Sequence, residues 1–306
     1  MLFHCHPRCD AALFSGGIAT GDIILCKRSL QYPRRLPDCH QQEPNRMHWI
    51  LQEGFVSETG WDALIATLER FGIGYSVHAV APKTGELLPP AVIAHANVMC
   101  IGSYSMRHVA AKHGWVPGVF DLYAQDFGQQ RAHWGEHMLN AGAVVSTVRD
   151  ARFSGGQMFV RPVNDSKYFS GRVFDADAFA AWQNAVCDPS DRHATSLAPD
   201  TLIQLSRPVA IYAEYRFWVV GGDIVTQSLY KRGSQVIYSS DVDERLTQFV
   251  KARIEEWSPH DAFVIDACDS ANGMKIVEIN TLNSSGFYAA DVQRLVLALD
   301  QRYVGP

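Results

Sequence analysis

The segment from Ala262 to Gly286 constrains the fold most strongly, because it combines two core-like strands with acidic residues. It reads AFVIDACDSANGMKIVEINTLNSSG, and Asn272-Gly273 separates its two apolar runs. Asn and Gly adopt positive φ angles at low cost, so this dipeptide favours a turn. Glu278 and Asn280 lie two positions apart in an extended run, and their side chains leave the same face of the sheet. With a turn centred near Asn272, Asp266 falls opposite Glu278.

The side chains of Asp266, Glu278 and Asn280 are suited to holding a magnesium ion. Mg²⁺ prefers oxygen ligands and is commonly shared with the phosphates of a substrate. A surface hairpin with scattered acids is the alternative. The apolar neighbours argue against it, because an unpaired carboxylate in a core strand is costly; they are Phe263, Val264, Ile265, Ile276, Val277 and Ile279. Without the cation, we expect the clustered oxygens to repel one another.

The composition is that of an ordinary globular protein and points to small-molecule partners. A chain of 306 residues, 47% hydrophobic and 19% charged, is long enough for two or three subdomains with cores. A net charge of -5 with dispersed Lys and Arg favours neither nucleic acid nor a membrane surface. No apolar run is long enough to span a bilayer, so a cytoplasmic protein is expected. The seven cysteines form no regular framework, which favours reduced thiols.

Residues 1–46 differ from the rest of the chain. They hold Cys5, His6, Cys9, Cys26, Cys39 and His40, together with a Pro/Arg cluster near Pro33, and show little periodicity. A zinc site is the alternative for these residues, but the paired short spacings of zinc modules are missing. We expect a poorly ordered leader, with an artefactual upstream start as its possible origin, and a domain that begins at Met47.

The rest of the chain divides into two regions by its periodicity. Residues 47–140 alternate strands with helices and predict a small α/β layer with a partly parallel sheet. Residues 141–306 are rich in strands and predict an α+β body. The expected strands are 48–52, 75–81, 96–101, 144–148, 157–163, 202–205, 211–220 and 224–231, besides the acidic hairpin. The expected helices are 61–71, 107–113, 121–140, 176–185, 243–256 and 290–302. His133 and His137 are better explained by a solvated helix than by a metal site.

The stretch Phe159 to Gly171 (FVRPVNDSKYFSG) is a candidate phosphate-binding strand and loop. Arg161 ends the strand and Lys167 lies in the loop. Cations and backbone N–H groups in such a loop neutralise a phosphate chain. An exposed turn with a solvated Lys167 is the alternative. Neither the Walker pattern nor the G-x-G-x-x-G pattern occurs, which argues against a P-loop or Rossmann nucleotide site.

A second hairpin, Ala213 to Arg232, carries charge on one face. Glu214, Arg216 and Trp218 share one face of its first strand, while the alternate residues form an apolar face. The returning strand ends in Lys231-Arg232, whose side chains point to opposite faces. One of them joins Glu214 and Arg216, and the turn at Gly221-Gly222 leaves open which. A mutual Glu–Arg pair on a solvated sheet is the alternative.

The order of these motifs resembles the ATP-grasp superfamily of carboxylate ligases, from about Met47 to the end of the chain. The nearest likeness is the clade named after two arginines and a lysine. The resemblance implies an α+β fold in which two subdomains grip ATP, at residues 141–306 with a hinge near 203–207. It also implies that residues 47–140 form the α/β domain that precedes the ATP-grasp domain.

The resemblance assigns expected roles to individual residues. Asp266, Glu278 and Asn280 match the magnesium ligands. Arg216 and Arg232 match catalytic positions, while Glu214 and Lys231 match nucleotide-binding positions. Arg161 stands where most of the superfamily has a lysine, and it is expected to bind the phosphates of ATP together with Lys167. Gln204, Leu205 and Ser206 fall at the adenine hinge, and Asn283, Ser284 and Ser285 are expected to contact the substrate.

The activity that the resemblance implies is an ATP-dependent carboxylate–amine ligase with ATP and Mg²⁺. In this reaction a carboxylate attacks the γ-phosphate, and an amine then attacks the acyl phosphate to form an amide or peptide-like bond. The partners are small-molecule or peptide acids and amines, and the sequence leaves their identity and the oligomeric state open. A nucleotide-binding regulatory module without ligase activity is one alternative, and a phosphotransferase on the same fold is another.

Overall fold

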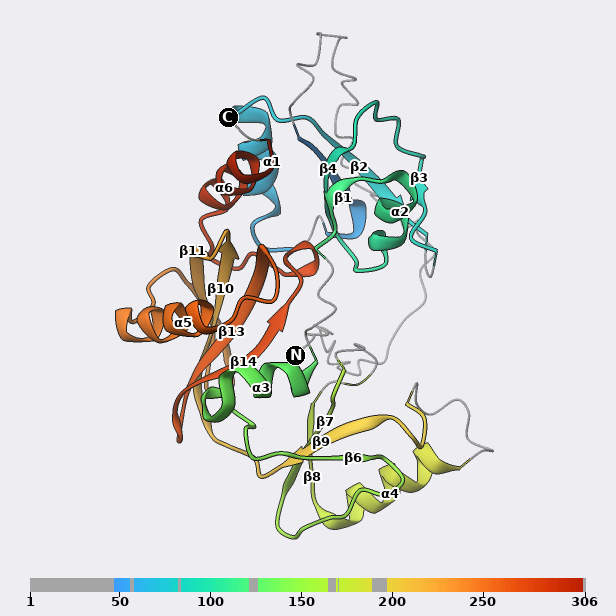
Figure 1. Cartoon of the computed structure of the whole chain (residues 1–306), viewed down its shortest axis with the longest axis vertical. Coiled ribbons are helices and arrows are strands. Elements are labelled where there is room, and N and C mark those ends of the chain that lie inside the picture. Colours follow the sequence, from blue (N-terminus) through green and yellow to red (C-terminus); the bar gives the residue numbers. More distant parts are fainter. Residues whose placement is uncertain are drawn as a thin grey trace, which may run out of the picture. The chain divides into compact units, whose positions relative to one another are not determined.

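The computed structural model describes residues 47–55, 58–81, 84–120, 126–164, 169, 171–188 and 197–304. The predicted leader and its Cys/His residues therefore lie outside the described part, and so does Lys167. Residues 44–306 form one compact unit. Figure 1 labels its helices and strands. In the described ranges, no helix is both long and apolar enough to cross a membrane.

The first sheet of this unit is mixed, with the strand order β3-β2-β1-β4-β5. The pairs β1–β2, β1–β4 and β4–β5 are parallel and β2–β3 is antiparallel, which confirms the predicted partly parallel sheet. Helices α1 and α2 belong to different cores, one on each side of the sheet. The elements are β1 (His48–Gln52), η1 (Glu53–Phe55), α1 (Trp61–Arg70), β2 (Tyr75–Val80), β3 (Leu87–Leu88), β4 (Asn97–Ile101), α2 (Met106–His113) and β5 (Val116–Gly118).

A small antiparallel sheet follows, with the order β6-β9-β7-β8. One of its faces packs on helix α4, whose N-cap Asp175 accepts a hydrogen bond from Ala178 N at 2.8 Å. Its other face carries Arg161 and Gln204, which are direct partners across β7 and β9. The elements are β6 (Val144–Thr147), β7 (Met158–Pro162), β8 (Arg172–Phe174), α4 (Ala176–Cys187) and β9 (Leu202–Ser206).

The third sheet is antiparallel, with the order β12-β11-β10-β13-β14. Phe217, Phe263 and Ile265 lie on one of its faces and pack with helices α3 and α5. The opposite face packs in part on α6 and α1. The elements are α3 (Phe127–Trp134), η2 (Gly135–His137), β10 (Ile211–Val220), β11 (Asp223–Arg232), β12 (Gln235–Ser239), α5 (Glu244–Glu256), β13 (Ala262–Ser270), β14 (Gly273–Asn280), η3 (Leu282–Ser284) and α6 (Val292–Val304).

The helix predicted for residues 121–140 is shorter in the structure. Its α-helical part is α3, which begins after the N-cap Asp126 and ends at Trp134. Gly135 has a φ angle of 47°, which an α-helix does not accommodate, and a 3-10 turn follows. The rings of His133 and His137 pack against Trp257 and Phe249, and among the described residues neither histidine belongs to a group that could hold a metal ion.

One face of β10 and β13 changes character along its length, and this change positions the candidate site. Trp218 and Val264 are direct partners and are sealed in the core that contains α6. Two residues further along the same face, Arg216 pairs with Asp266. Burial of charged groups is costly unless they are paired, so this end of the sheet needs a separate explanation.

Candidate functional site

The acidic hairpin has the predicted cross-strand pair, and a β-bulge produces it. The turn pairs Ser270 with Gly273, and an unbroken register from there would place Val277 opposite Asp266. A register shift beside Asp266 leaves Val277 as the extra residue and makes Glu278 the direct partner of Asp266. Bulges re-aim side chains in this way. The expected pairing of Asp266 with Glu278 is confirmed.

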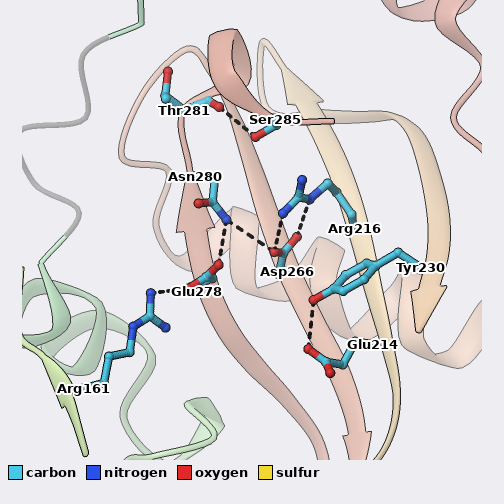
Figure 2. A network of polar contacts seen from close by, with 9 residues as sticks. All are labelled: Arg161, Glu214, Arg216, Tyr230, Asp266, Glu278, Asn280, Thr281 and Ser285. Carbon is cyan, nitrogen blue, oxygen red and sulfur yellow. Dashed lines mark hydrogen bonds and ion pairs between the residues drawn. The ribbon is translucent and has the colours of Figure 1, made fainter. Parts of the chain in front are cut away.

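Arg216 and Asp266 form a bidentate ion pair on this face (Figure 2). Arg216 Nε and Nη2 donate to the two carboxylate oxygens of Asp266, each at 2.8 Å. Both residues are buried, with 8% and 1% of their surfaces exposed. Two parallel N–H···O bonds fix the plane of the guanidinium and satisfy the buried carboxylate. The expected repulsion among the acids is thus relieved by arginine in the structure.

Glu278 is neutralised from a different sheet. Arg161 of β7 forms an ion pair with Glu278, so a side chain of the small antiparallel sheet meets the acidic hairpin. Asn280 Nδ2 donates to Glu278 Oε1 at 3.0 Å and lies 3.3 Å from Asp266 Oδ2. Figure 2 shows this chain of contacts running from Arg161 through Glu278 and Asn280 to Asp266 and Arg216. The predicted metal ligands and two of the three predicted arginines, Arg161 and Arg216, therefore form one connected cluster.

Two bulges decide which basic residue joins Glu214. The turn pairs Val220 with Asp223, and one-residue shifts at two places move the partner of Glu214 from Leu229 to Lys231. Lys231 Nζ donates to Glu214 Oε1 at 2.5 Å. Arg232 pairs with Ala213 instead and is exposed, and its charge acts on Tyr215, whose side chain lies on the opposite face from Glu214. Lys231 therefore lies on the same face as Glu214 and Arg216. Arg232, for which a catalytic position was expected, lies on the opposite face.

Tyr230 and Tyr288 also belong to the site, and the sequence analysis missed both. The Tyr230 hydroxyl donates to Glu214 Oε2 at 3.0 Å, and both rings lie next to Arg216. Strict alternation would send Tyr230 to the face opposite Lys231, and the bulge removes this alternation. Tyr288 lies in the segment between η3 and α6, where no strand periodicity signals its direction.

The electrostatics of the cluster follow from burial and pairing. Burial raises the pKa of Asp266, as does the charge of Glu278, while Arg216 opposes both effects. Burial also acts to raise the pKa of Glu278, but the charge of Arg161 and the hydrogen bonds from Asn280 and Arg161 act against it, and the net effect lowers the pKa below its ordinary value. Burial lowers the pKa of Arg216 less than Asp266 raises it, so the guanidinium stays charged. Burial raises the pKa of Tyr288 to about 12, which keeps its hydroxyl protonated.

A pocket adjoins the cluster on the side of the small sheet. Arg161, Gln204 and Glu278 line it together with residues of α3 and with Met138 and Asn140, which follow η2. Gln204 Oε1 is buried there without a hydrogen-bond partner in the described part of the chain. The sheet face that carries Arg161 and Gln204 also exposes apolar side chains, with Val145, Val173 and Leu202 between 38% and 49% exposed. The side chain of Leu205 points to the other face and is buried in the core with α4. Of the expected hinge residues, Gln204 reaches the pocket and Leu205 does not.

Asn283 is buried, and its side-chain amide is hydrogen-bonded to backbone groups. It is 1% exposed, and its Nδ2 donates to Cys100 O at 2.5 Å and to Gly118 O at 3.1 Å. Its Oδ1 accepts from Phe120 N at 2.7 Å. These bonds join the first sheet to η3 and favour a structural role, and the expected contact of Asn283 with substrate stays a prediction. Ser285 is also buried and donates to Thr281 O at 2.8 Å, whereas Ser284 is half-buried.

The family of the chain follows from its match to a family model. The matching model is that of an ATP-grasp domain, family 3 of the clade named after two arginines and a lysine, and it covers residues 97–299, a span that includes every residue of the cluster. The chain belongs to this ATP-grasp family. No curated protein matches the chain significantly in sequence.

Solved structures share this ATP-grasp fold with the chain at low sequence identity. D-alanine–D-alanine ligase from Bacillus anthracis complexed with ATP matches with a TM-score of 0.57 and 12% identity, over 85% of this chain and 96% of that one. An ATP-grasp protein of the RimK domain type from Sphaerobacter thermophilus matches with a TM-score of 0.53 and 14% identity, over 84% and 96%. An L-amino acid ligase from Bacillus licheniformis matches with a TM-score of 0.51 and 11% identity, over 84% and 75%. At these identities the likeness establishes the fold alone.

Proposed function

We propose that this ATP-grasp protein is an ATP-dependent carboxylate–amine ligase that uses magnesium. The observation that carries the proposal is the connected cluster of Arg161, Glu278, Asn280, Asp266 and Arg216, to which two different sheets contribute. In this cluster two carboxylates lie between two arginines. The carboxylates suit a metal ion, and the arginines suit the phosphates that the metal ion carries. The ATP-dependent and amino-acid ligases among the solved structures of the same fold support the proposal.

ATP would use the small sheet for its base and the arginines for its phosphates. The exposed apolar face around Val173 and Leu202 suits an adenine ring, and the buried Oε1 of Gln204 lacks a donor that an amino group supplies. Arg161 already binds a carboxylate at the edge of this face, and a phosphate oxygen makes an equivalent partner. Lys167 is expected to add a second cation on the same phosphates.

The donor set fits Mg²⁺. Asp266 and Glu278 are cross-strand partners with Asn280 on the same face, and they offer hard oxygen ligands without sulfur or imidazole. When bound, Mg²⁺ neutralises the phosphate charge that develops during phosphoryl transfer. Because Arg161 and Arg216 pair with the two carboxylates in the present structure, we expect loading to shift at least Arg161 from Glu278 to a phosphate.

The chain's own residues need only position and stabilise the reactants. A substrate carboxylate oxygen forms a bond to the γ-phosphorus of ATP, and ADP leaves with the electron pair of the broken bond. The amine then attacks the acyl carbon, inorganic phosphate leaves, and the amine nitrogen loses a proton. Arg216 would stabilise the charge on the transferring group through Nη1, which Asp266 leaves unused. No side chain has to act as a nucleophile.

Substrate-dependent ADP release tests this function. The purified chain is incubated with ATP, Mg²⁺ and panels of amino acids and peptides, with Glu278→Gln as the inactive control. A ligase releases ADP and phosphate only when an acid and an amine are both present. ADP release with phosphate retained on one acceptor would identify a phosphotransferase, and ATP binding without turnover across the panels would identify a regulatory module. Either result contradicts the proposal.

A further inference from the structure

A stack of tyrosine rings lies against Arg216. Tyr288 stands in the middle, with ring centroids 5.2 Å from Tyr230 and 5.0 Å from Tyr238 and with interplanar angles of 28° and 19°. The guanidinium carbon of Arg216 lies 4.9 Å from the centroid of Tyr288 and 5.6 Å from that of Tyr230. These distances are in the range of cation–π attraction.

Arg216 is thus held on two sides by different means. Asp266 fixes Nε and Nη2, and in the described residues Nη1 has no hydrogen-bond partner. Figure 2 shows the third nitrogen directed away from Asp266. A second carboxylate at this place would cancel the charge of the guanidinium, whereas an aromatic ring restrains it and leaves its charge in place. The tyrosines therefore suit a cation that has to act on a phosphate.

The backbone around Tyr288 is arranged to hold the ring in place. Tyr288 has a φ angle of 53°, in the left-handed region that costs a residue with a side chain about 1 kcal/mol or more. The next segment is tied to β11, because Ala289 N donates to Ser228 Oγ at 3.1 Å and Asp291 N to Thr226 Oγ1 at 2.8 Å. On the other side, Phe287 is anchored in the core with α6. The surrounding contacts hold this unfavourable conformation.

We propose that Tyr288 is a positioning residue for Arg216. Its ring restrains the guanidinium in the orientation in which the guanidinium contacts the transferring phosphoryl group. Tyr230 and Tyr238 clamp the ring, and Glu214 fixes Tyr230 through its hydroxyl. This inference rests on the proposed ligase function for its catalytic consequence, but the restraint of the guanidinium does not depend on that function.

Kinetics of two Tyr288 variants test the catalytic consequence. Tyr288→Leu removes the π face at similar bulk, and we expect kcat for ADP formation to fall about 10- to 100-fold, because a misplaced stabiliser loses its transition-state contact. The Kd of Mg·ATP should change by less than about twofold, because uniform binding is retained. Tyr288→Phe keeps the ring and should lose no more than about threefold in kcat. A Tyr288→Leu variant with kcat within twofold of the parent, or a Tyr288→Phe variant as slow as Tyr288→Leu, overturns the proposal.

NMR of the arginine Nε–H groups tests the restraint without any turnover. The Arg216 signal is assigned by its loss in Arg216→Lys. We expect a sharp, slowly exchanging signal in the parent and in Tyr288→Phe, and a broadened or shifted one in Tyr288→Leu. Tyr238→Leu, which removes only the outer ring of the stack, serves as the matched control and should change the signal less. If Tyr288→Leu does not fold, Tyr238→Leu becomes the test variant. We then expect its Arg216 signal to be partly broadened relative to that of the parent.

The two readouts separate the two claims. An unchanged Arg216 signal in the leucine variants, or no visible signal in the parent, overturns the role of Tyr288. A parent that forms no ADP with any acid and amine contradicts the ligase function instead, while the NMR result still decides the role of Tyr288.

Discussion

The two ends of one face of β10 and β13 differ in what buries them. At one end, Trp218 and Val264 are covered by α6 and its neighbours in a continuous apolar core. At the other end, Arg216 and Asp266 are almost as deeply buried, but they are covered by Tyr230, Tyr288 and one another. Apolar packing serves stability in the first case. A buried network of paired charges is weak evidence for stability, and here it is better explained by a ligand.

The largest expected effect at the apolar end is on stability. Trp218→Ala removes a fully buried side chain, and we expect the free energy of unfolding to fall by about 3–5 kcal/mol. Chemical denaturation measures this change. If the comparison holds, Mg·ATP binding by the folded fraction stays close to that of the parent. A Trp218→Ala protein as stable as the parent would show that the two ends do not differ in this way.

The largest expected effect at the charged end is on turnover. Glu278→Gln keeps the size of the side chain and removes a formal charge from the proposed metal site, so we expect ADP formation to fall by a factor of about 1,000 or more. Stability should change little, because Arg161 remains one-fifth exposed and can be solvated. Asp269→Asn is the matched control, since this acid lies on β13 and is exposed. An equal loss of ADP formation in Glu278→Gln and Asp269→Asn would contradict the role of Glu278 as a metal ligand.

Replacing either of the two arginines of the cluster should change a different kinetic parameter, kcat for Arg216 and the KM for ATP for Arg161. Arg216→Ala is expected to lower kcat by roughly 100-fold or more, because it removes a preorganised stabiliser of the transferring group. It should also destabilise the fold, by leaving Asp266 buried without its partner. Arg161→Ala is expected to raise the KM for ATP about tenfold and to affect kcat less, as loss of ground-state binding does. Steady-state kinetics with ATP as the varied substrate distinguish the two. The opposite pattern would exchange the roles assigned to the arginines.

A smaller effect is expected at Asn283. Asn283→Ala leaves backbone groups of Cys100, Gly118 and Phe120 without their partner, which should lower the free energy of unfolding by about 1–3 kcal/mol. The KM for acid and amine should not change if the residue is structural. A stable Asn283→Ala variant with a raised substrate KM would restore the role first expected from the sequence.

The sequence predicted some contacts of the site and not others, and the reason lies in how each contact is formed. The Asp266–Glu278 pair was predicted from a turn centred near Asn272, but the observed turn pairs Ser270 with Gly273, and the predicted partner is reached only through a bulge that the sequence did not signal. The partner of Glu214 was not, because two separate bulges move it from Leu229 to Lys231 and neither has a sequence signature of its own. Asn283 was assigned to substrate as a small polar residue after a strand, and only tertiary contacts show that its amide is consumed by backbone groups. Tyr288 lies outside any regular element, so periodicity could not predict its position beside Arg216.

The central claim is that the charged end of this face binds ATP together with magnesium, and a thermal shift experiment tests it most directly. The melting temperature is measured with ATP, with Mg²⁺, and with both, for the parent and for Glu278→Gln. At a hundredfold excess over Kd we expect Mg·ATP to raise the parent's melting temperature by roughly 5 °C or more. Either component alone should act less, and the shift in Glu278→Gln should be strongly reduced. A folded parent whose melting temperature does not change at saturating ATP and Mg²⁺ would contradict the account.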